Sequence, residues 1–281
     1  MKIKNIVNRN STALLALCIL VASCQKMDRP ALADYPKDAN PPGGPLKFYT
    51  AFDGGNVDSI RANFGVSENV TYEPGVTGMA YKGGPNSYVK YTAANDFANV
   101  TSFTVSFWLK KAGPPAAGTG TQWVFGLPTT TDIWHKHEMF LEFEDANNPS
   151  SADLAAGKLL IQDQWFEFTG AKRLPNLFNN QWHHLAFVYN ETTSKLATYL
   201  DGVAQFPNDA SLTDVKKNGN PRGPLSFTNV QGFVIGAPGH YALGKTPDDW
   251  MHNFQGSLDQ FRLYGKALSA AEITTLYNSK L

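Results

Sequence analysis

The sequence predicts an all-β protein, either a sandwich or a barrel. From Leu46 onward, apolar and polar side chains alternate with a period of two, which is the period of a β-strand. The alternating stretches are short, and clusters of Gly, Pro, Asn and Asp separate them. Almost no stretch has the period of a helix. Many short strands between turn clusters are typical of sandwiches and barrels.

Residues 1–23 are predicted to be a targeting segment that is removed from the mature protein. Lys2, Lys4 and Arg9 make its start positive, and an apolar run of about ten residues, Ala13 to Ala22, follows. A membrane-spanning helix needs about twenty apolar residues, so this run is too short to be one. A basic start followed by a short apolar run is typical of a signal peptide.

The end of this segment, "LVASC", resembles a bacterial lipobox. The resemblance implies cleavage before Cys24 and attachment of lipid to its sulfur and new amino terminus, as in an outer-membrane lipoprotein of the cell envelope. The alternative is an ordinary signal peptide that happens to contain a cysteine. The next letters, "QKMD", partly match lysine-plus-acid signals for the outer face of the outer membrane. Whether the protein is surface-exposed or periplasmic therefore stays open.

The cysteine count limits how the folded part is stabilised. The chain contains only Cys18 and Cys24. Cys18 leaves with the signal peptide, and Cys24 carries the lipid. Export usually permits disulfides, but the folded part then has no thiol to form one. Burial of a core, for which the chain is long enough, or a bound metal must stabilise it.

The charge of the chain argues against a nucleic-acid partner. The sequence contains 24 basic and 24 acidic residues, and loss of the signal peptide removes three basic ones, which leaves a net charge of about −3. Proteins that follow a phosphate backbone need a basic surface, usually with interleaved aromatic side chains. No such stripe occurs, so we expect no binding to nucleic acid.

Residues 24–45 are predicted to be a tether between the lipid and the folded domain. From residue 25 the segment reads "QKMDRPALADYPKDANPPGGP", with five prolines, paired glycines and alternating charges. It has no apolar period of either kind. Such a segment is semi-extended and spans about 30–60 Å. It is expected to hold the domain, residues 46–281, away from the membrane.

The strand pattern is clearest in "FTVSFWLK", which begins at Phe103. Phe103, Val105, Phe107 and Leu109 fall on one face of the expected strand, and the residues between them fall on the other. "KLATYLDG" has the same alternation and ends in an Asp-Gly turn, and "GFVIGA" and "LDQFRLYG" repeat it.

One helix is predicted, at the C-terminal end of the chain. In "LSAAEITTLY", Ser269 is followed three residues later by Glu272, which is a capping box that satisfies free amides at a helix start. Leu268 and Ile273 occupy the two positions of a hydrophobic staple. The face that should dock on the sandwich consists of Ile273, Leu276 and Tyr277.

The paired histidines in "QWHHLAFVYN" are predicted to be core residues. Side chains alternate across a strand, so His183 and His184 point to opposite faces and cannot bind one metal together. Both faces of the stretch are rich in apolar groups, which indicates a central strand. We expect each histidine to be packed and hydrogen-bonded.

Three stretches resemble the laminin-G-like (LamG) branch of the concanavalin A-like lectin/glucanase superfamily. They are "FTVSFWLK", "QWHHLAFVYNETTSKLATYLDG" and "FQGSLDQFRLYGKALSAAEITTLY", in this order and spacing. The resemblance covers residues 46–281 and implies a two-sheet antiparallel jelly-roll sandwich of about a dozen strands, with a short C-terminal helix. The superfamily includes lectins, glycan-binding modules, adhesins and glycoside hydrolases, so the fold does not decide the function.

The glucanases of this superfamily carry Glu-x-Asp-x-x-Glu on the concave sheet, as the nucleophile, an orienting group and the acid/base. The nearest stretch here is "HEMFLEFEDANN", in which Glu138, Glu142 and Glu144 share a face. No aspartate stands between two correctly spaced glutamates, so we expect no catalytic residues. The alternative is a hydrolase with an altered acid pair, Glu142 and Glu144. His135 and His137 also share a face, but two histidines alone are a weak zinc signal.

The mixture of groups that bind a sugar occurs in "KLLIQDQWFEF". Sugar rings stack on aromatic planes, and their hydroxyls need nearby carboxylates or amides. Asp163, Trp165 and Glu167 alternate with Phe166 and Phe168, so Trp165 lies between two acids on one face. Large aromatic side chains in polar loops extend the candidate site, or else hold those loops down as hydrophobic clamps. They are Trp134, His240, Tyr241 and Trp250.

These patterns favour noncatalytic binding of a glycan, or of another extracellular ligand, by a lipid-anchored envelope protein. The alternatives are a glycoside hydrolase of the concanavalin A-like type and a protein–protein adhesion module. The geometry of the concave face discriminates between them. An open groove with Trp165 and acids favours a sugar, and a face filled by its own side chains favours binding at the loops or to a protein.

A structural calcium ion is expected near Asp259. By alternation, Asp259 points to the same face as Phe261 and Leu263, where an unpaired carboxylate is costly. Asp53 lies before a Gly-Gly turn in "AFDGGNVDS". The resemblance implies that the first and last strands are neighbours and that many members hold a calcium between them, for which oxygen ligands are suited. The alternative is that Asp259 accepts backbone hydrogen bonds or pairs with an arginine.

Overall fold

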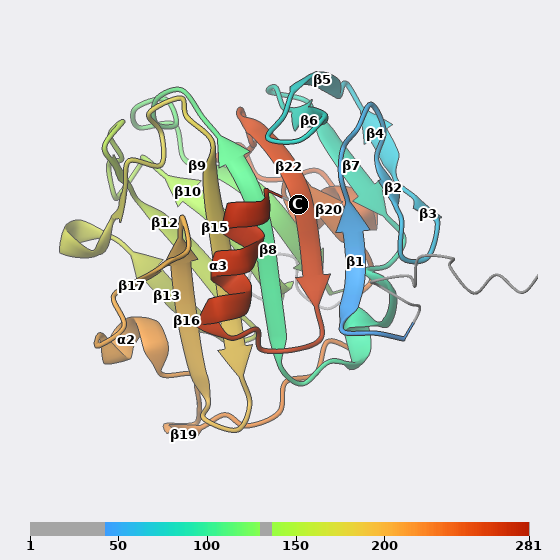
Figure 1. The fold of residues 1–281 in the computed structure, drawn as a ribbon. Coiled ribbons are helices and arrows are strands. Elements are labelled where there is room, and N and C mark those ends of the chain that lie inside the picture. Colours follow the sequence, from blue (N-terminus) through green and yellow to red (C-terminus); the bar gives the residue numbers. More distant parts are fainter. Residues whose placement is uncertain (1–42, 130–136, 281) are drawn as a thin grey trace, which may run out of the picture. The chain divides into compact units, whose positions relative to one another are not determined.

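The fold is a sandwich of two large sheets, seen in a computed structural model that describes residues 43–129 and 137–280 (Figure 1). The first sheet consists of β1 (Leu46–Thr50), β5 (Thr71–Pro74), β6 (Met79–Lys82), β8 (Phe103–Lys110), β15 (His183–Asn190), β16 (Lys195–Leu200), β17 (Val203–Gln205) and β22 (Ser257–Tyr264). Its strands lie in the order β17-β16-β15-β8-β22-β6-β5, and β1 pairs with β22.

The second sheet also has eight strands. They are β4 (Val66–Glu68), β7 (Tyr88–Tyr91), β9 (Thr121–Pro128), β10 (His137–Glu144), β12 (Gly157–Ile161), β13 (Gln164–Phe168), β20 (Phe233–Ile235) and β21 (Met251–Asn253). They lie in the order β13-β12-β10-β9-β20-β7-β4. All described pairs in both sheets are antiparallel except β21, which runs parallel to β9.

Among the described residues, several short elements lie outside the two large sheets. Three small two-stranded pairs are β2 (Val57–Asp58) with β3 (Asn63–Phe64), β11 (Leu154–Ala155) with β14 (Leu174–Pro175), and β18 (Lys216–Lys217) with β19 (Asn220–Pro221). The helices are α2 (Ala210–Thr213), α3 (Ala270–Ser279) and the 3-10 turns η1 (Asn95–Asn99), η2 (Gly170–Lys172) and η3 (Gly239–Leu243).

The prediction of an all-β, two-sheet antiparallel jelly roll with a C-terminal helix is confirmed. The two sheets contain more strands than the expected dozen, because short strands such as β4, β17 and β21, of three residues each, extend them. The first and last strands of the domain are neighbours, since Thr50 of β1 pairs with Phe261 of β22.

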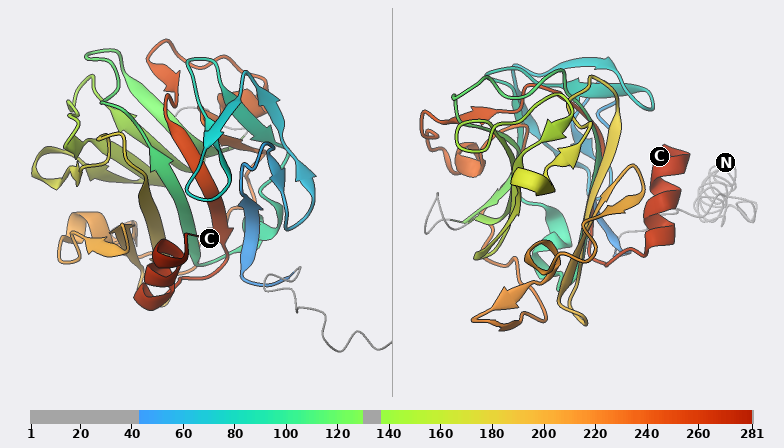
Figure 2. Two further views of the ribbon diagram at one scale, coloured as in Figure 1. Left: turned by 45° about the horizontal axis from the view of Figure 1, so that its top comes forward. Right: turned by 90° about the vertical axis from the view of Figure 1, so that its left-hand side faces the viewer.

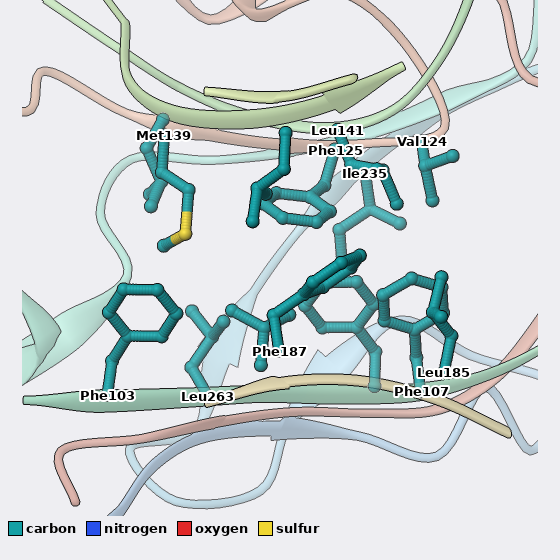
Figure 3. Packing of buried hydrophobic residues seen from close by; sticks show 14 of the residues in the cluster. Phe103, Phe107, Val124, Phe125, Met139, Leu141, Leu185, Phe187, Ile235 and Leu263 are labelled. Carbon is teal, nitrogen blue, oxygen red and sulfur yellow. The ribbon is translucent and has the colours of Figure 1, made fainter. Parts of the chain in front are cut away.

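The core lies between the two sheets and contains the side chains that alternation assigned to it. On β8, Phe103, Val105, Phe107 and Leu109 are fully buried there. Figure 3 shows the first sheet contributing Phe103, Phe107, Leu185, Phe187 and Leu263, which face Val124, Phe125, Met139, Leu141 and Ile235 of the second. Burial of apolar surface between the sheets is therefore the main stabilising contribution.

Helix α3 covers the outer face of the first sheet (Figure 2). Its capping box is confirmed: the Ser269 hydroxyl accepts from the Glu272 amide, and the Glu272 carboxylate accepts from the Ser269 amide at 2.7 Å. Leu268 and Ile273 are buried in one apolar cluster with residues of β15 and β16. Tyr277 stacks on Trp108 of β8, with ring centroids 5.6 Å apart.

The two neighbouring histidines on β15 are structural, as predicted. Nδ1 of His183 lies 2.8 Å from a carboxylate oxygen of Asp201, and Nε2 of His184 lies 2.8 Å from the Ser106 hydroxyl. Burial lowers the pKa of His184 to about 4, so this ring is neutral at physiological pH. The two side chains point to opposite faces of the first sheet, as alternation requires, so they cannot bind one metal together.

One predicted face is wrong, that of Asp259 on β22. Gln260 has a positive φ of 52°, and the pairing of β22 with β8 shifts between Asp259 and Arg262. This extra residue is a β-bulge, which interrupts the alternation of side chains. Leu258 and Phe261 therefore both lie in the core, and Asp259 does not share their face. It is nevertheless fully buried.

Candidate functional site

A pocket of about 600 Å³ lies on the outer face of the second sheet. Alternation along β10 explains its floor: Met139 and Leu141 enter the core, whereas Phe140, Glu142 and Glu144 point to the pocket. Neighbouring strands β9, β12 and β13 present their own outward side chains beside β10. The sheet thus gathers side chains that are far apart in the sequence.

Aromatic side chains form the apolar part of this pocket. Trp123 of β9 stacks on Phe140 with ring centroids 4.1 Å apart, and Phe140 meets the edge of Trp165 at 5.3 Å. Met251, the first residue of β21, belongs to the same cluster, and Trp250, just before it, packs against it. Trp165 is only half-buried, so part of its ring faces the pocket. Such a surface suits the apolar face of a ligand.

Three glutamates and one lysine form the polar part of the pocket. Glu142 and Glu144 are 3% and 4% exposed, and Glu167 of β13 is exposed. Nζ of Lys158 on β12 lies 2.5 Å from Oε1 of Glu144 and 3.5 Å from Oε1 of Glu167. Asn148 donates to the other oxygen of Glu144. Both oxygens of Glu144 therefore have a partner. Lys158 forms its ion pairs with Glu144 and Glu167 and not with Glu142.

The two buried glutamates differ in their electrostatic surroundings. Burial, and then the neighbouring charge of Glu144, raises the pKa of Glu142 to about 8, although Lys158 and the Thr121 hydroxyl act in the opposite direction. Oε2 of Glu142 has no hydrogen-bond partner among the described residues. At neutral pH Glu142 is therefore mostly an uncharged acid, beside a Glu144 that is paired with a cation.

A second pocket, of about 670 Å³, continues on the other side of Trp165. Trp165 lines both pockets, and the two neighbouring pockets are together called the groove. In the second part, Arg222 pairs with Asp163 and donates from Nη1 to Gln162 at 2.5 Å. Its lining residues are Thr129, His137, Glu138, Leu160, Gln162, Asp163, Trp165, Lys217, Arg222, Ser226 and Asn229.

The 3-10 turn η3 lies against the second sheet beside this groove. It packs against β9, β20 and β7, and the approach is close because Gly126 of β9 has no side chain: a Cβ there would lie 3.1 Å from the Gly239 amide. His240 is buried, and Tyr241 stacks on Tyr88 of β7 with ring centroids 4.3 Å apart. Neither His240 nor Tyr241 lines the two parts of the groove.

The structure thus brings together some of the candidate binding residues and not others. Trp165, Glu167 and Trp250 line the first pocket, with Glu142 and Glu144 of the alternative hydrolase pair, and Asp163 lines the second. Phe166 and Phe168 face the core, as alternation requires. His240 and Tyr241 instead hold η3 against the second sheet, His240 as a buried side chain and Tyr241 by stacking on Tyr88. Trp134 and His135 lie outside the described residues.

Trp123, Phe140 and Lys158 belong to the pocket but were not among the candidates. One signal was available for Lys158. Strands β12 and β13 form a hairpin through the short turn at Gln162 and Asp163, and its register pairs Lys158 with Glu167. The order of the strands, which places Trp123 beside Phe140, has no equivalent local signal.

Asp53 and Asp259 both lie at the turn between β5 and β6. Oδ2 of Asp259 accepts from the amides of Val76 and Thr77 at 2.7 and 3.3 Å, and Oδ1 of Asp53 accepts from the Met79 amide at 2.7 Å. Oδ1 of Asp259 is buried without a hydrogen-bond partner among the described residues. Burial raises the pKa of Asp259 to about 6. This orphaned oxygen fits a cation, whereas the two amides match the alternative of backbone hydrogen bonds.

Within 43–129 and 137–280, no three His, Cys, Asp or Glu side chains cluster closely enough to hold a metal by themselves. In the same part of the chain, no helix is long and apolar enough to cross a membrane.

The chain belongs to the concanavalin A-like lectin/glucanase superfamily. The family described as "Concanavalin A-like lectin/glucanases superfamily" matches residues 82–274, which is well over half of the chain and includes the strands that build the groove. The resemblance seen in the sequence is therefore confirmed. Among curated proteins, none matches the sequence.

Several solved structures share the fold. Domain 4 of AbnA, an extracellular arabinanase from Geobacillus stearothermophilus solved with arabinotriose, is 20% identical with a TM-score of 0.54, and the match covers 83% of this chain and 98% of that one. A Trypanosoma rangeli sialidase mutant is 17% identical with a TM-score of 0.56, covering 86% and 34%. The binding domain of botulinum neurotoxin DC, solved with rat synaptotagmin II, is 13% identical with a TM-score of 0.51, covering 84% and 52%.

At these identities the likeness concerns the fold alone. This chain spans about a third of the sialidase and about half of the toxin domain, so the activities of those whole proteins do not transfer to it.

Proposed function

We propose that the protein binds a glycan, without cleaving it, in the groove on the outer face of its second sheet. The observation that carries the proposal is the half-buried Trp165, which lies between two pockets lined by carboxylate, amide and ammonium groups. A sugar ring needs an aromatic plane for its apolar face and polar groups for its hydroxyls, and few other ligands need this combination.

The arrangement favours a chain over a single sugar. Pockets of about 600 and 670 Å³ meet at Trp165, so a ligand that stacks on this ring extends into both. The domain is presented at the cell envelope by a lipid on Cys24 and by the tether of residues 24–45. Capture of polysaccharide beside an uptake machinery fits this position.

Replacing Trp165 with alanine is expected to weaken glycan binding at least about fivefold. Loss of one aromatic stacking partner typically costs about 1 kcal/mol, which corresponds to that factor. The measurement is isothermal titration of the purified domain with the glycan that gives the strongest signal on a glycan array. Trp182→Ala is the matched control, because Trp182 is also half-buried but lies on β15's side of the sandwich, against Lys110. Equal weakening by both variants would contradict the assignment of the groove.

A second candidate function is glycoside hydrolysis, and the Glu142–Glu144 pair favours it. A neutral acid beside an ionised carboxylate is the combination that glycosidases use. The engagement of both Glu144 oxygens by Lys158 and Asn148 argues for binding instead, because a nucleophile needs a free oxygen. Release of reducing ends from polysaccharides that Glu142→Gln or Glu144→Gln abolishes would establish the hydrolase. Binding to an envelope protein rather than to any array glycan would establish the adhesion module.

We also propose that Asp53 and Asp259 hold a structural calcium ion. The support is the buried, unpartnered Oδ1 of Asp259 and the contacts that both carboxylates make to one turn, that between β5 and β6. Calcium prefers carboxylate and carbonyl oxygens, and this domain contains no cysteine from residue 25 onward that could stabilise it otherwise.

Millimolar calcium is therefore expected to raise the melting temperature of the EDTA-treated domain. A ligand at about 100 times its Kd stabilises the folded state by about 2.7 kcal/mol, which is about 5–10 °C for a domain of this size. Asp259→Asn should remove most of the rise, and the exposed Asp153→Asn should retain it. An unchanged melting temperature, with no metal by elemental analysis, would exclude the site.

A further inference from the structure

Glu142 is the buried polar group at the floor of the first pocket. It is 3% exposed, and its Oε2 has no hydrogen-bond partner among the described residues. A buried polar atom without a partner costs free energy that a hydrogen bond would recover. Because this atom lines a pocket, a ligand can supply the missing partner.

The charged groups around Glu142 leave it without a cation of its own. Glu144 faces it from the same strand, and Lys158 faces it from β12, with Glu167 beyond on β13. Lys158 contacts Glu144 at 2.5 Å and Glu167 at 3.5 Å. The side chains that line the pocket from β9 and from the segment leading into β21 are uncharged. The first pocket therefore holds three acids and one base.

We propose that Glu142 binds the ligand as an uncharged carboxylic acid, donating a hydrogen bond to a glycan hydroxyl, and that the other acids of the pocket make the groove selective for uncharged glycans. The inference rests on the proposed function. Glu144 and Glu167 line the same pocket against a single base, Lys158, so they repel the charge of a uronic acid or sulfated sugar. A sugar hydroxyl can accept a hydrogen bond from protonated Glu142 and donate one to the carboxylate of Glu144 or Glu167.

Binding is then linked to a proton. The pKa of Glu142, raised by burial and by Glu144 to about 8, lies within an accessible pH range. The protonated form is the one that binds, so affinity is full below this pKa and is lost as pH rises through it. At pH 9, about one-tenth of the sites remain protonated, and the apparent Kd should be about tenfold higher than at pH 6.

The experiment is isothermal titration of the mature protein with xylohexaose, cellohexaose, laminarihexaose, arabinohexaose and a galacturonic acid hexamer, at pH 6 and pH 9. At least one uncharged hexamer should bind with the tenfold pH effect, and the acidic hexamer should bind least. Glu142→Gln keeps a donor and cannot ionise, so it should bind at pH 6 and lose the pH effect. Glu68→Gln, at an exposed position that lines neither pocket, should keep it.

These variants also separate Glu142 from Lys111, whose pKa burial lowers to about 8 as well but which lines a different pocket. A pH-independent Kd in the wild type, or preference for the acidic hexamer, would overturn the inference and leave the proposed function intact. If no hexamer binds, the proposed function fails. Carboxyl NMR of the free protein then still decides the protonation state, since a Glu142 signal that titrates near pH 4.5 would overturn the inference independently.

Discussion

Replacing Phe107 with alanine is expected to lower the free energy of unfolding by about 3–5 kcal/mol. Phe107 is fully buried on β8. Its ring stacks on Phe261 of the same sheet, with centroids 5.2 Å apart. It also makes an edge contact with Phe125, with centroids 6.3 Å apart, and Figure 3 shows Phe107 and Phe125 facing each other from the two sheets. Alanine would leave a cavity between two hydrogen-bonded sheets, which cannot move together enough to close it.

Urea unfolding of the purified domain, followed by tryptophan fluorescence, measures this loss. Phe64→Ala is the matched control, because Phe64 is 73% exposed on the short strand β3 and should change stability by less than about 0.5 kcal/mol. A loss below 1 kcal/mol for Phe107→Ala would mean that the sheets do not pack at this position. The effect is large because a domain without disulfides depends on its core.

The core faces could be predicted because the backbone of a strand fixes them. Side chains in β8 and β15 alternate without interruption, so every second residue, from Phe103 to Leu109 and from Leu185 to Tyr189, lies in the core. The capping box of α3 is equally local, since Ser269 and Glu272 are three residues apart. Strand alternation and the capping box can be predicted from the sequence because they depend only on residues a few positions apart.

The misplaced face of Asp259 has the opposite cause. The bulge at Gln260 depends on how β22 pairs with β8. It inserts one residue, so the faces of the side chains on its two sides no longer alternate, and no residue in the sequence indicates the insertion. An asparagine or glycine at a positive φ would have been such an indication, but the residue is glutamine. The expectation of a buried carboxylate held, whereas the face that buries it could not be predicted.

The groove could be predicted only in part, because most of it also depends on pairing between strands that are distant in the sequence. Trp165 and Glu167 share one face of a single strand, so their proximity follows from alternation. Trp123, Phe140 and Lys158 join them only through the order β13-β12-β10-β9. The raised pKa of Glu142 depends on burial under this assembled face and on its ion-paired neighbour, and neither is visible in one strand. Long-range pairing therefore decides most of the site's chemistry.

Replacing Cys24 with serine is expected to abolish lipid labelling and release the protein from the membrane fraction. Lipid attachment requires the sulfur of this residue, and no cysteine follows it in the chain. Each buried CH₂ of an acyl chain contributes about 0.8 kcal/mol of membrane affinity, so losing the acyl chains removes many times the free energy of any single contact considered above. The predicted effect is accordingly all-or-none, not a shift in affinity.

The measurement is growth with a clickable fatty-acid analogue, followed by fractionation and detection of label and protein. Cys18→Ser is the matched control: Cys18 lies in the apolar run of the predicted signal peptide, so this variant should keep both the label and the membrane position. If Cys24→Ser partitions and labels as the wild type does, "LVASC" is only the end of an ordinary signal peptide. If the wild type is instead labelled and Cys24→Ser is not, proteolysis of intact cells decides the leaflet, because a tether of residues 24–45 is cut from outside only if the domain faces outward.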